Sequence, residues 1–94
     1  MENLELPDLV KSFLDSKEQN KEQWEEKISK VVLELLMHNT SSLYQVLYRI
    51  DVKEEKVKEA FFDNPLAEIA AERITKLIID RQMEKIQWRK KYSS

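Results

Sequence analysis

Residues 64–92 read "NPLAEIAAERITKLIIDRQMEKIQWRKKY" and contain no glycine, while Pro65 is their only proline. Asparagine is a residue type that caps helix N-termini, and proline suits the first helical position because the N–H that it lacks would have no partner there. No helix breaker follows before Ser93. The stretch therefore predicts one helix of about 26 residues that starts at Asn64-Pro65.

Apolar residues along this helix fall on two lines when they are spaced at 100° per residue. The main arc holds Leu66, Ala70, Ile74, Leu77, Ile78, Trp88 and Tyr92. A second line of Ile79, Met83 and Ile86 begins near the middle and lies roughly on the opposite side. The helix would be about 39 Å long, whereas a compact chain of this size has a radius of gyration of about 12 Å. We therefore expect its distal half to be contacted from both sides, by a short first helix or by a second copy.

Upstream, residues 43–65 ("LYQVLYRIDVKEEKVKEAFFDNP") place two short helical patterns around "IDV", as in a DNA-reading helix-turn-helix. A recognition helix needs exposed hydrogen-bond donors at its N-terminal end. Here residues 51–63 carry five acids against three lysines, and the acids come first. Because DNA phosphates would repel them, the pattern favours a corner in a helical bundle. Asp51 with Glu54 is expected to cap the second of the two helices.

The N-terminal half continues the helical pattern. Apolar spacing predicts a short helix over residues 7–16, a linker at 16–20 and a bundle over 20–92, with Asn20 as a cap and "HNTSS" (38–42) as a stop and new cap. The predicted fold is all-α, a single domain (1–94) that forms a compact bundle of four to five helices with a long C-terminal helix. One buried cluster is expected to hold Trp24, Ile28, Val31, Leu35, Leu47, Ile50, Phe61, Ile74, Leu77 and Ile78.

Composition excludes several kinds of functional site. A chain without glycine has no phosphate-cradling glycine-rich loop, and a chain without cysteine has no disulfide, thiolate metal site or cysteine nucleophile. His38 is the only histidine, and we interpret it as a helix C-terminal residue that complements the helix dipole. No metal, cofactor or catalytic residue is predicted, and the chain is not expected to be an enzyme. No apolar run approaches the roughly 20 residues that span a bilayer, so a cytoplasmic protein is expected.

Charge is distributed unevenly along the chain. Residues 1–64 carry 14 acids and 9 bases, whereas residues 65–94 carry 4 acids and 7 bases. A basic aromatic end is formed by Arg81, Lys85, Trp88, Arg89, Lys90, Lys91 and Tyr92. Such an end suits an acidic protein surface or a nucleic-acid backbone, although compensation of the helix dipole alone explains two or three of the basic residues. Arg81 also falls within the main apolar arc, so we expect it to pair with Asp51.

The runs "LYRIDV" (47–52) and "LIIDRQMEKIQWRKKY" (77–92) resemble a small family of uncharacterised all-helical bacterial proteins, with similarity over residues 20–92. The resemblance implies a bacterial cytoplasmic protein. It brings no assigned activity, ligand or catalytic residue, so the interpretation of the residues themselves is unchanged.

The sequence leaves two functions open. The favoured one is a small helical protein-interaction module that self-associates through its last helix, with a homodimer favoured over a monomer because one short helix cannot cover both apolar lines. The predicted contact residues are Ile79, Met83, Ile86, Trp88, Arg89 and Tyr92. The alternative is a nucleic-acid-associated accessory protein that uses the basic aromatic end, although the net charge of −2 disfavours autonomous DNA binding.

Overall fold

Five helices make up most of the residues that the structure, a computed structural model, describes, namely 5–16 and 20–92. They are α1 (Leu6–Asp15), α2 (Lys21–His38), α3 (Thr40–Arg49), α4 (Glu54–Ala60) and α5 (Ala67–Tyr92). No strand occurs within these two ranges. The prediction of an all-α fold with a long C-terminal helix is confirmed, and α5 contains 26 residues. The first helix begins and ends one residue earlier than predicted.

Asparagine side chains begin both α2 and α3, at the two places where the sequence predicts caps. Asn20 Oδ1 accepts a hydrogen bond from the Gln23 N–H at 3.4 Å, and Asn39 Oδ1 accepts one from the Ser42 N–H at 3.3 Å. The Asn39 N–H also donates to the Leu35 carbonyl at 2.7 Å, so Asn39 ends α2 as well as starting α3. Each cap satisfies a backbone donor that has no acceptor within its own helix.

Two of the predicted helix starts are wrong. Asp51 has a φ of 61° and does not cap α4; Lys53 occupies that position and makes no side-chain cap. Asn64 has a φ of 51°, and α5 begins only at Ala67. Aspartate and asparagine tolerate the left-handed region better than other non-glycine residues. In a chain without glycine, Asp51, Asp63 and Asn64 therefore occupy the positive-φ positions of the turns.

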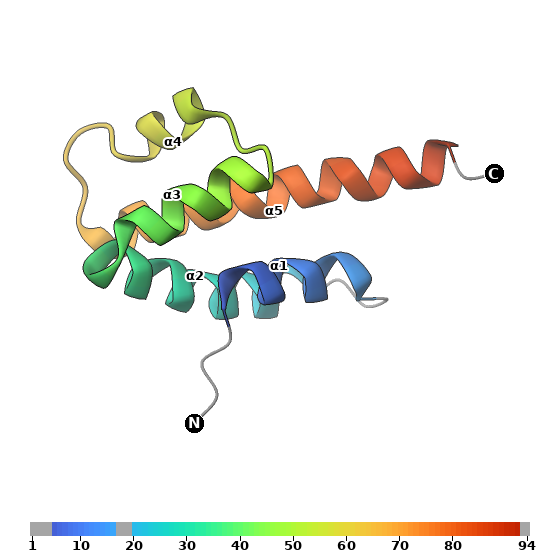
Figure 1. Cartoon of the computed structure of the whole chain (residues 1–94), viewed down its shortest axis with the longest axis horizontal. Coiled ribbons are helices and arrows are strands. Elements are labelled where there is room, and N and C mark those ends of the chain that lie inside the picture. Colours follow the sequence, from blue (N-terminus) through green and yellow to red (C-terminus); the bar gives the residue numbers. More distant parts are fainter. Residues whose placement is uncertain (1–4, 17–19, 93–94) are drawn as a thin grey trace.

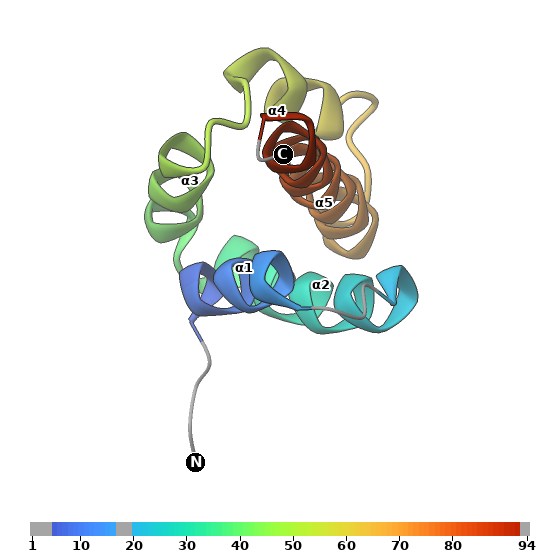
Figure 2. The ribbon, with the colours of Figure 1, turned by 90° about the vertical axis from the view of Figure 1, so that its right-hand side faces the viewer.

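α1, α2 and α4 pack against α5, which makes its most extensive contact with α2, while α3 packs against α2 and α1. Figure 1 shows α1 and α2 below α5, with α3 alongside it and α4 above. Figure 2, viewed nearly along α5, shows the same three sides of this helix occupied. The longest dimension of the molecule is 44 Å. At a rise of 1.5 Å per residue α5 is about 39 Å long, so it extends over most of that dimension.

The core lies where α1, α2, α3 and α5 meet, and it confirms four of the ten predicted members as buried. Ile28, Leu47, Ile74 and Ile78 are fully buried in it. The other predicted members are only partly buried and pack against it: Trp24, Val31, Leu35, Ile50, Phe61 and Leu77. Truncation of these six should therefore cost less than truncation of the four that are fully enclosed.

The predicted cluster omits α1, which contributes much of the core. Leu6, Leu9, Val10 and Phe13 are all buried. The Phe13 ring packs edge-on against Trp24 of α2, with ring centroids 5.7 Å apart and an interplanar angle of 76°. Edge-to-face pairs of this kind are a favourable aromatic geometry. The short first helix is therefore an integral layer of the fold.

The buried part of α5 is one broad face, not two opposite apolar lines. Two polar residues, Thr75 and Gln82, are buried on it together with the isoleucines of both predicted lines. Ile79 and Ile86 belong to the core cluster, and Met83 is half-buried against it. The second line is thus covered within the chain, because α1 also packs against α5.

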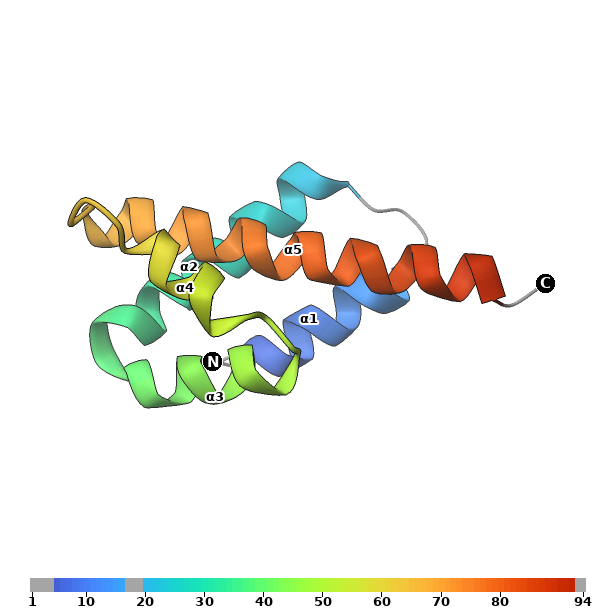
Figure 3. The same cartoon turned by 90° about the horizontal axis from the view of Figure 1, so that it is seen from above.

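The last turns of α5 extend past the other helices, as Figures 1 and 3 show. Ile86 is the last buried residue of this helix, and residues 87–91 are all exposed. The side chain of Tyr92 lies outside the described part of the structure. Residues 87–91 at the end of α5 therefore do not pack in the core.

Candidate interaction surface

A groove of about 620 Å³ lies between α3 and α4. Its floor is apolar, because Leu47 and Val57 line it and are otherwise enclosed by the core. Tyr44 and Tyr48, one turn apart on α3, form a wall and are 48% and 86% exposed. The remaining lining residues are Asp51, Val52, Lys53 and Glu54. The groove therefore combines an apolar floor, aromatic side chains and a charged rim.

The shape of this groove is set by the way α3 ends. The Val52 N–H donates to the Leu47 carbonyl at 3.0 Å, and the Asp51 N–H donates to the Tyr48 carbonyl at 3.2 Å. With Asp51 at positive φ, these two bonds form a Schellman motif, in which the left-handed position is usually glycine. Val52 and Leu47, the residues that touch in such a motif, both line the groove. Asp51 thus terminates α3, whereas the sequence predicts that it starts α4.

Two basic residues of α5, Arg81 and Lys85, contact the turn between α3 and α4, which we call the corner. Arg81 Nη2 lies 3.9 Å from Asp51 Oδ2, and Arg81 Nη1 lies 2.9 Å from Glu84 Oε2. Lys85 Nζ donates to the Ile50 carbonyl at 3.3 Å. The expected pairing of Arg81 with Asp51 is therefore present as a long contact, and Glu84 is the closer partner. Since both carboxylates are largely exposed, these ion pairs orient the corner more than they stabilise the fold.

Trp88 lies on the same side of α5 as Arg81, closer to the end of the helix. It follows Arg81 by seven residues, nearly two full turns, so it lies about 10 Å further along the axis and on the side that faces the corner. Its side chain is 66% exposed, and Arg89, Lys90 and Lys91 beside it are exposed as well. We call the α3–α4 groove together with residues 88–91 the distal surface.

The structure brings only some of the predicted contact residues to a surface. Trp88 and Arg89 are exposed, whereas Ile79 and Ile86 are buried in the core and Met83 is half-buried against it. The prediction that two molecules contact each other through Ile79, Met83 and Ile86 is therefore wrong, because these residues lie in the core or pack against it. Tyr92, the sixth predicted residue, has a side chain outside the described part of the structure.

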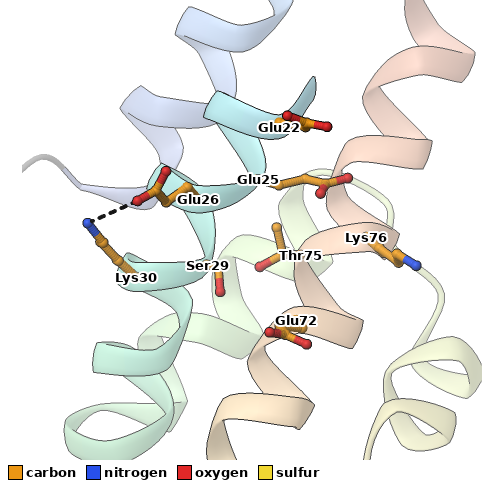
Figure 4. Close-up of a pocket in the computed structure, with 8 residues that line it drawn as sticks. All are labelled: Glu22, Glu25, Glu26, Ser29, Lys30, Glu72, Thr75 and Lys76. Carbon is orange, nitrogen blue, oxygen red and sulfur yellow. Dashed lines mark ion pairs between the residues drawn. The ribbon is translucent and has the colours of Figure 1, made fainter. Parts of the chain in front are cut away.

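A second groove, of about 570 Å³, separates α2 from the N-terminal half of α5 (Figure 4). Four glutamates and two lysines line it, together with Ser29 and Thr75. Lys30 Nζ lies 3.7 Å from Glu26 Oε1, and Figure 4 shows this pair on the outer side of α2, away from Thr75. The Thr75 hydroxyl donates to the Ala71 carbonyl at 2.7 Å, inside its own helix. The side chains do not converge, and no described group of three or more acids or histidines could hold a metal ion.

His38 lies exposed in the last turn of α2, the position interpreted from the sequence. A cation there would complement the negative end of the helix dipole. Among the helices within the described ranges, none is both long enough and apolar enough to cross a membrane.

The α3–α4 groove was not among the predicted sites. Its sequence signal is Tyr44 and Tyr48 at an i,i+4 spacing, which places two side chains on one helix face. The same spacing is typical of core residues, and Leu43 and Leu47 beside them are indeed buried. Only the packing of α3 distinguishes the exposed pair from the buried one.

No protein-family model, curated protein or solved structure matches the chain. The resemblance of residues 47–52 and 77–92 to a bacterial family stays a prediction.

Proposed function

We propose that this protein is a non-enzymatic, cytoplasmic protein-interaction module that binds its partner through the distal surface. The observation that carries the proposal is the exposed Trp88 ring, placed next to three consecutive basic residues on a helix end that extends past the fold. Tryptophan and arginine are enriched among the residues that dominate binding energy. A large aromatic ring that is mostly exposed at the end of a helix offers apolar area for contact with a partner.

The charge of the helix end indicates the kind of partner. Arg89, Lys90 and Lys91 lie in the last turn, where compensation of the helix dipole explains two or three basic residues, and Arg81 and Lys85 bring the basic residues of residues 81–91 to five. Basic groups of this kind steer association with an acidic surface and raise the association rate. The expected partner therefore presents carboxylates around an apolar or aromatic patch.

The test is affinity capture from extracts of the cells in which the protein occurs. Wild-type protein is compared with a Trp88→Ala/Arg89→Glu variant and with Phe62→Ala as a matched control. Phe62 is 75% exposed in the turn after α4, outside the distal surface. Captured proteins, including untagged copies of the chain, should be lost with the double variant and kept with the control. Equal capture by all three proteins would refute the proposed function.

A second candidate is favoured by the same residues: a nucleic-acid-associated accessory protein. An exposed aromatic ring next to basic side chains can stack on a base while the cations contact phosphates. Three phosphate contacts predict that the affinity for single strands falls with salt with a logarithmic slope of about −2. Fluorescence anisotropy with a labelled single-stranded oligonucleotide measures this slope. Binding that is absent at low salt, or unchanged by Trp88→Ala, would remove this candidate.

A further inference from the structure

The distal surface has an acidic part and a basic part on one molecule. The groove is lined by two acids, Asp51 and Glu54, against one lysine, Lys53, a net charge of −1, whereas Arg89, Lys90 and Lys91 at the helix end carry +3. Arg81 connects the two parts, because it contacts Asp51 at 3.9 Å and lies on the same side of α5 as Trp88. A surface with adjacent patches of opposite charge can complement a rotated copy of itself.

We infer that the partner bound by the distal surface is a second copy of this chain, related to the first by a two-fold axis that passes near Arg81. The inference rests on the proposed function, since it uses the same surface. Across the axis, the basic end of each copy lies against the groove of the other. Arg89 then meets Glu54 of the other copy, and Trp88 covers the apolar floor beside Tyr48.

The two parts of the surface have similar lengths and opposite charges. Tyr44 to Tyr48 on α3 and Trp88 to Lys91 on α5 each extend over about one helical turn, or roughly 5 Å. Each copy has a net charge of only −2, so long-range repulsion between copies is small compared with attraction at the contact. The contact does not use Ile79 and Ile86, which stay in the core.

The exposed aromatic area sets the strength of the contact. A covered aromatic side chain buries about 150–250 Å². With exposed fractions of 48%, 86% and 66%, Tyr44, Tyr48 and Trp88 together offer roughly 300–500 Å² on each copy. A standard stable interface needs about 800 Å² per partner. The charged rim supplies part of the difference, so the chain forms a weak dimer in equilibrium with monomer, and salt loosens it.

Sedimentation equilibrium of the full chain, at low and high salt and up to high micromolar concentration, tests the inference. The dimer fraction should rise with protein concentration and fall with salt. Trp88→Ala and Tyr48→Ala should each weaken association by about tenfold, as expected of aromatic residues at the centre of a contact. Phe62→Ala, the exposed control, should leave the dissociation constant unchanged. Circular dichroism confirms that each variant remains helical.

A charge-swap experiment tests the two-fold arrangement itself. Glu54→Arg and Arg89→Glu, each alone, place like charges across both contacts of the dimer and should abolish it. An equal mixture of the two variants restores opposite charges at both contacts, so a heterodimer should form. Such mutual rescue cannot arise from an effect within one chain. Glu54 suits the test because its contact with Lys58 is long, at 3.9 Å, and exposed.

The outcomes separate this inference from the proposed function. A wild-type chain that stays monomeric at high micromolar concentration and low salt overturns the dimer, and so does a dimer that none of these substitutions weakens. If Trp88 and Arg89 still capture a different protein, the proposed function stands without the dimer. If the monomer instead binds the oligonucleotide through Trp88, both are overturned in favour of the nucleic-acid candidate. Mutual rescue supports the inference.

Discussion

Gln82 is the most unusual side chain in the core of this protein. It is 0% exposed, and within the described residues neither its amide nitrogen nor its amide oxygen has a protein hydrogen-bond partner. Methionine has nearly the same length and volume but lacks both polar atoms, and it adapts readily to the shape of a core site. We therefore predict that Gln82→Met stabilises the fold.

The size of this effect follows from the desolvation of the amide. A buried polar group without a partner costs about 1–3 kcal/mol relative to the same group in water. Glutamine and methionine lose similar rotamer entropy on burial, so that contribution largely cancels. The free energy of unfolding should therefore rise by about 1–3 kcal/mol. For a domain of this size, the corresponding increase in Tm is about 4–24 °C.

Urea unfolding followed by circular dichroism measures the change, at low protein concentration and high salt so that self-association does not contribute. The midpoint should shift upwards while the slope m stays constant, because the surface exposed on unfolding is nearly the same. Gln87→Met is the matched control, since Gln87 is exposed on the same helix. Its effect should stay within about 0.5 kcal/mol.

A Gln82→Met variant that is no more stable than the wild type would refute this reasoning. It would show that the amide makes hydrogen bonds in solution that outweigh its burial. A stabilisation shared equally by Gln87→Met would also refute it, because the gain would then come from helix propensity and not from the core.

Three further predictions concern the stability of the fold, and urea unfolding measures each of them. Arg73 Nη1 donates to the Ala60 and Phe62 carbonyls and to Asp63 Oδ1, at the end of α4 and in the turn that follows it. Arg73→Met should therefore lower the free energy of unfolding by about 1–2 kcal/mol, a modest loss because the side chain is 39% exposed. If Lys76→Met on the exposed face of α5 lowers the free energy of unfolding as much, the effect does not come from the hydrogen bonds of Arg73. Asn39→Ala removes the cap of α3 and should cost about 0.5–2 kcal/mol; no change would mean that the cap is absent in solution. Ile74→Ala should lower the free energy of unfolding by about 2–5 kcal/mol, and Leu35→Ala by distinctly less because Leu35 is only half-buried. Equal losses would contradict this difference in burial.

The sequence by itself determined the features that depend on neighbouring residues. The long uninterrupted pattern after Pro65 predicts α5, and Asn20 and Asn39 stand where caps form. Ile28 and Ile74 were expected in the core from helical spacing alone. The long helix and the two caps are local features, because a helix and its cap depend on residues at most four positions apart.

The sequence did not determine the use of the turn residues. Asp51 and Asn64 are suited both to helix N-caps and to the left-handed positions that glycine usually takes. The structure uses them in the second way. The choice depends on the direction in which the chain must leave α3 and enter α5, and that direction is set by the packing of distant helices.

Tertiary structure also decided which surface is available for contact. Thr75 and Gln82 interrupt the apolar pattern of α5, so helical spacing divides one buried face into two lines and suggests that one of them lies outside. In the fold, α1 packs against α5, and Ile79 is enclosed while Trp88 and Tyr48 remain exposed. Periodicity reports which side chains share a face of a helix. It carries no information on what covers that face, because burial depends on contacts between residues that are far apart in the chain.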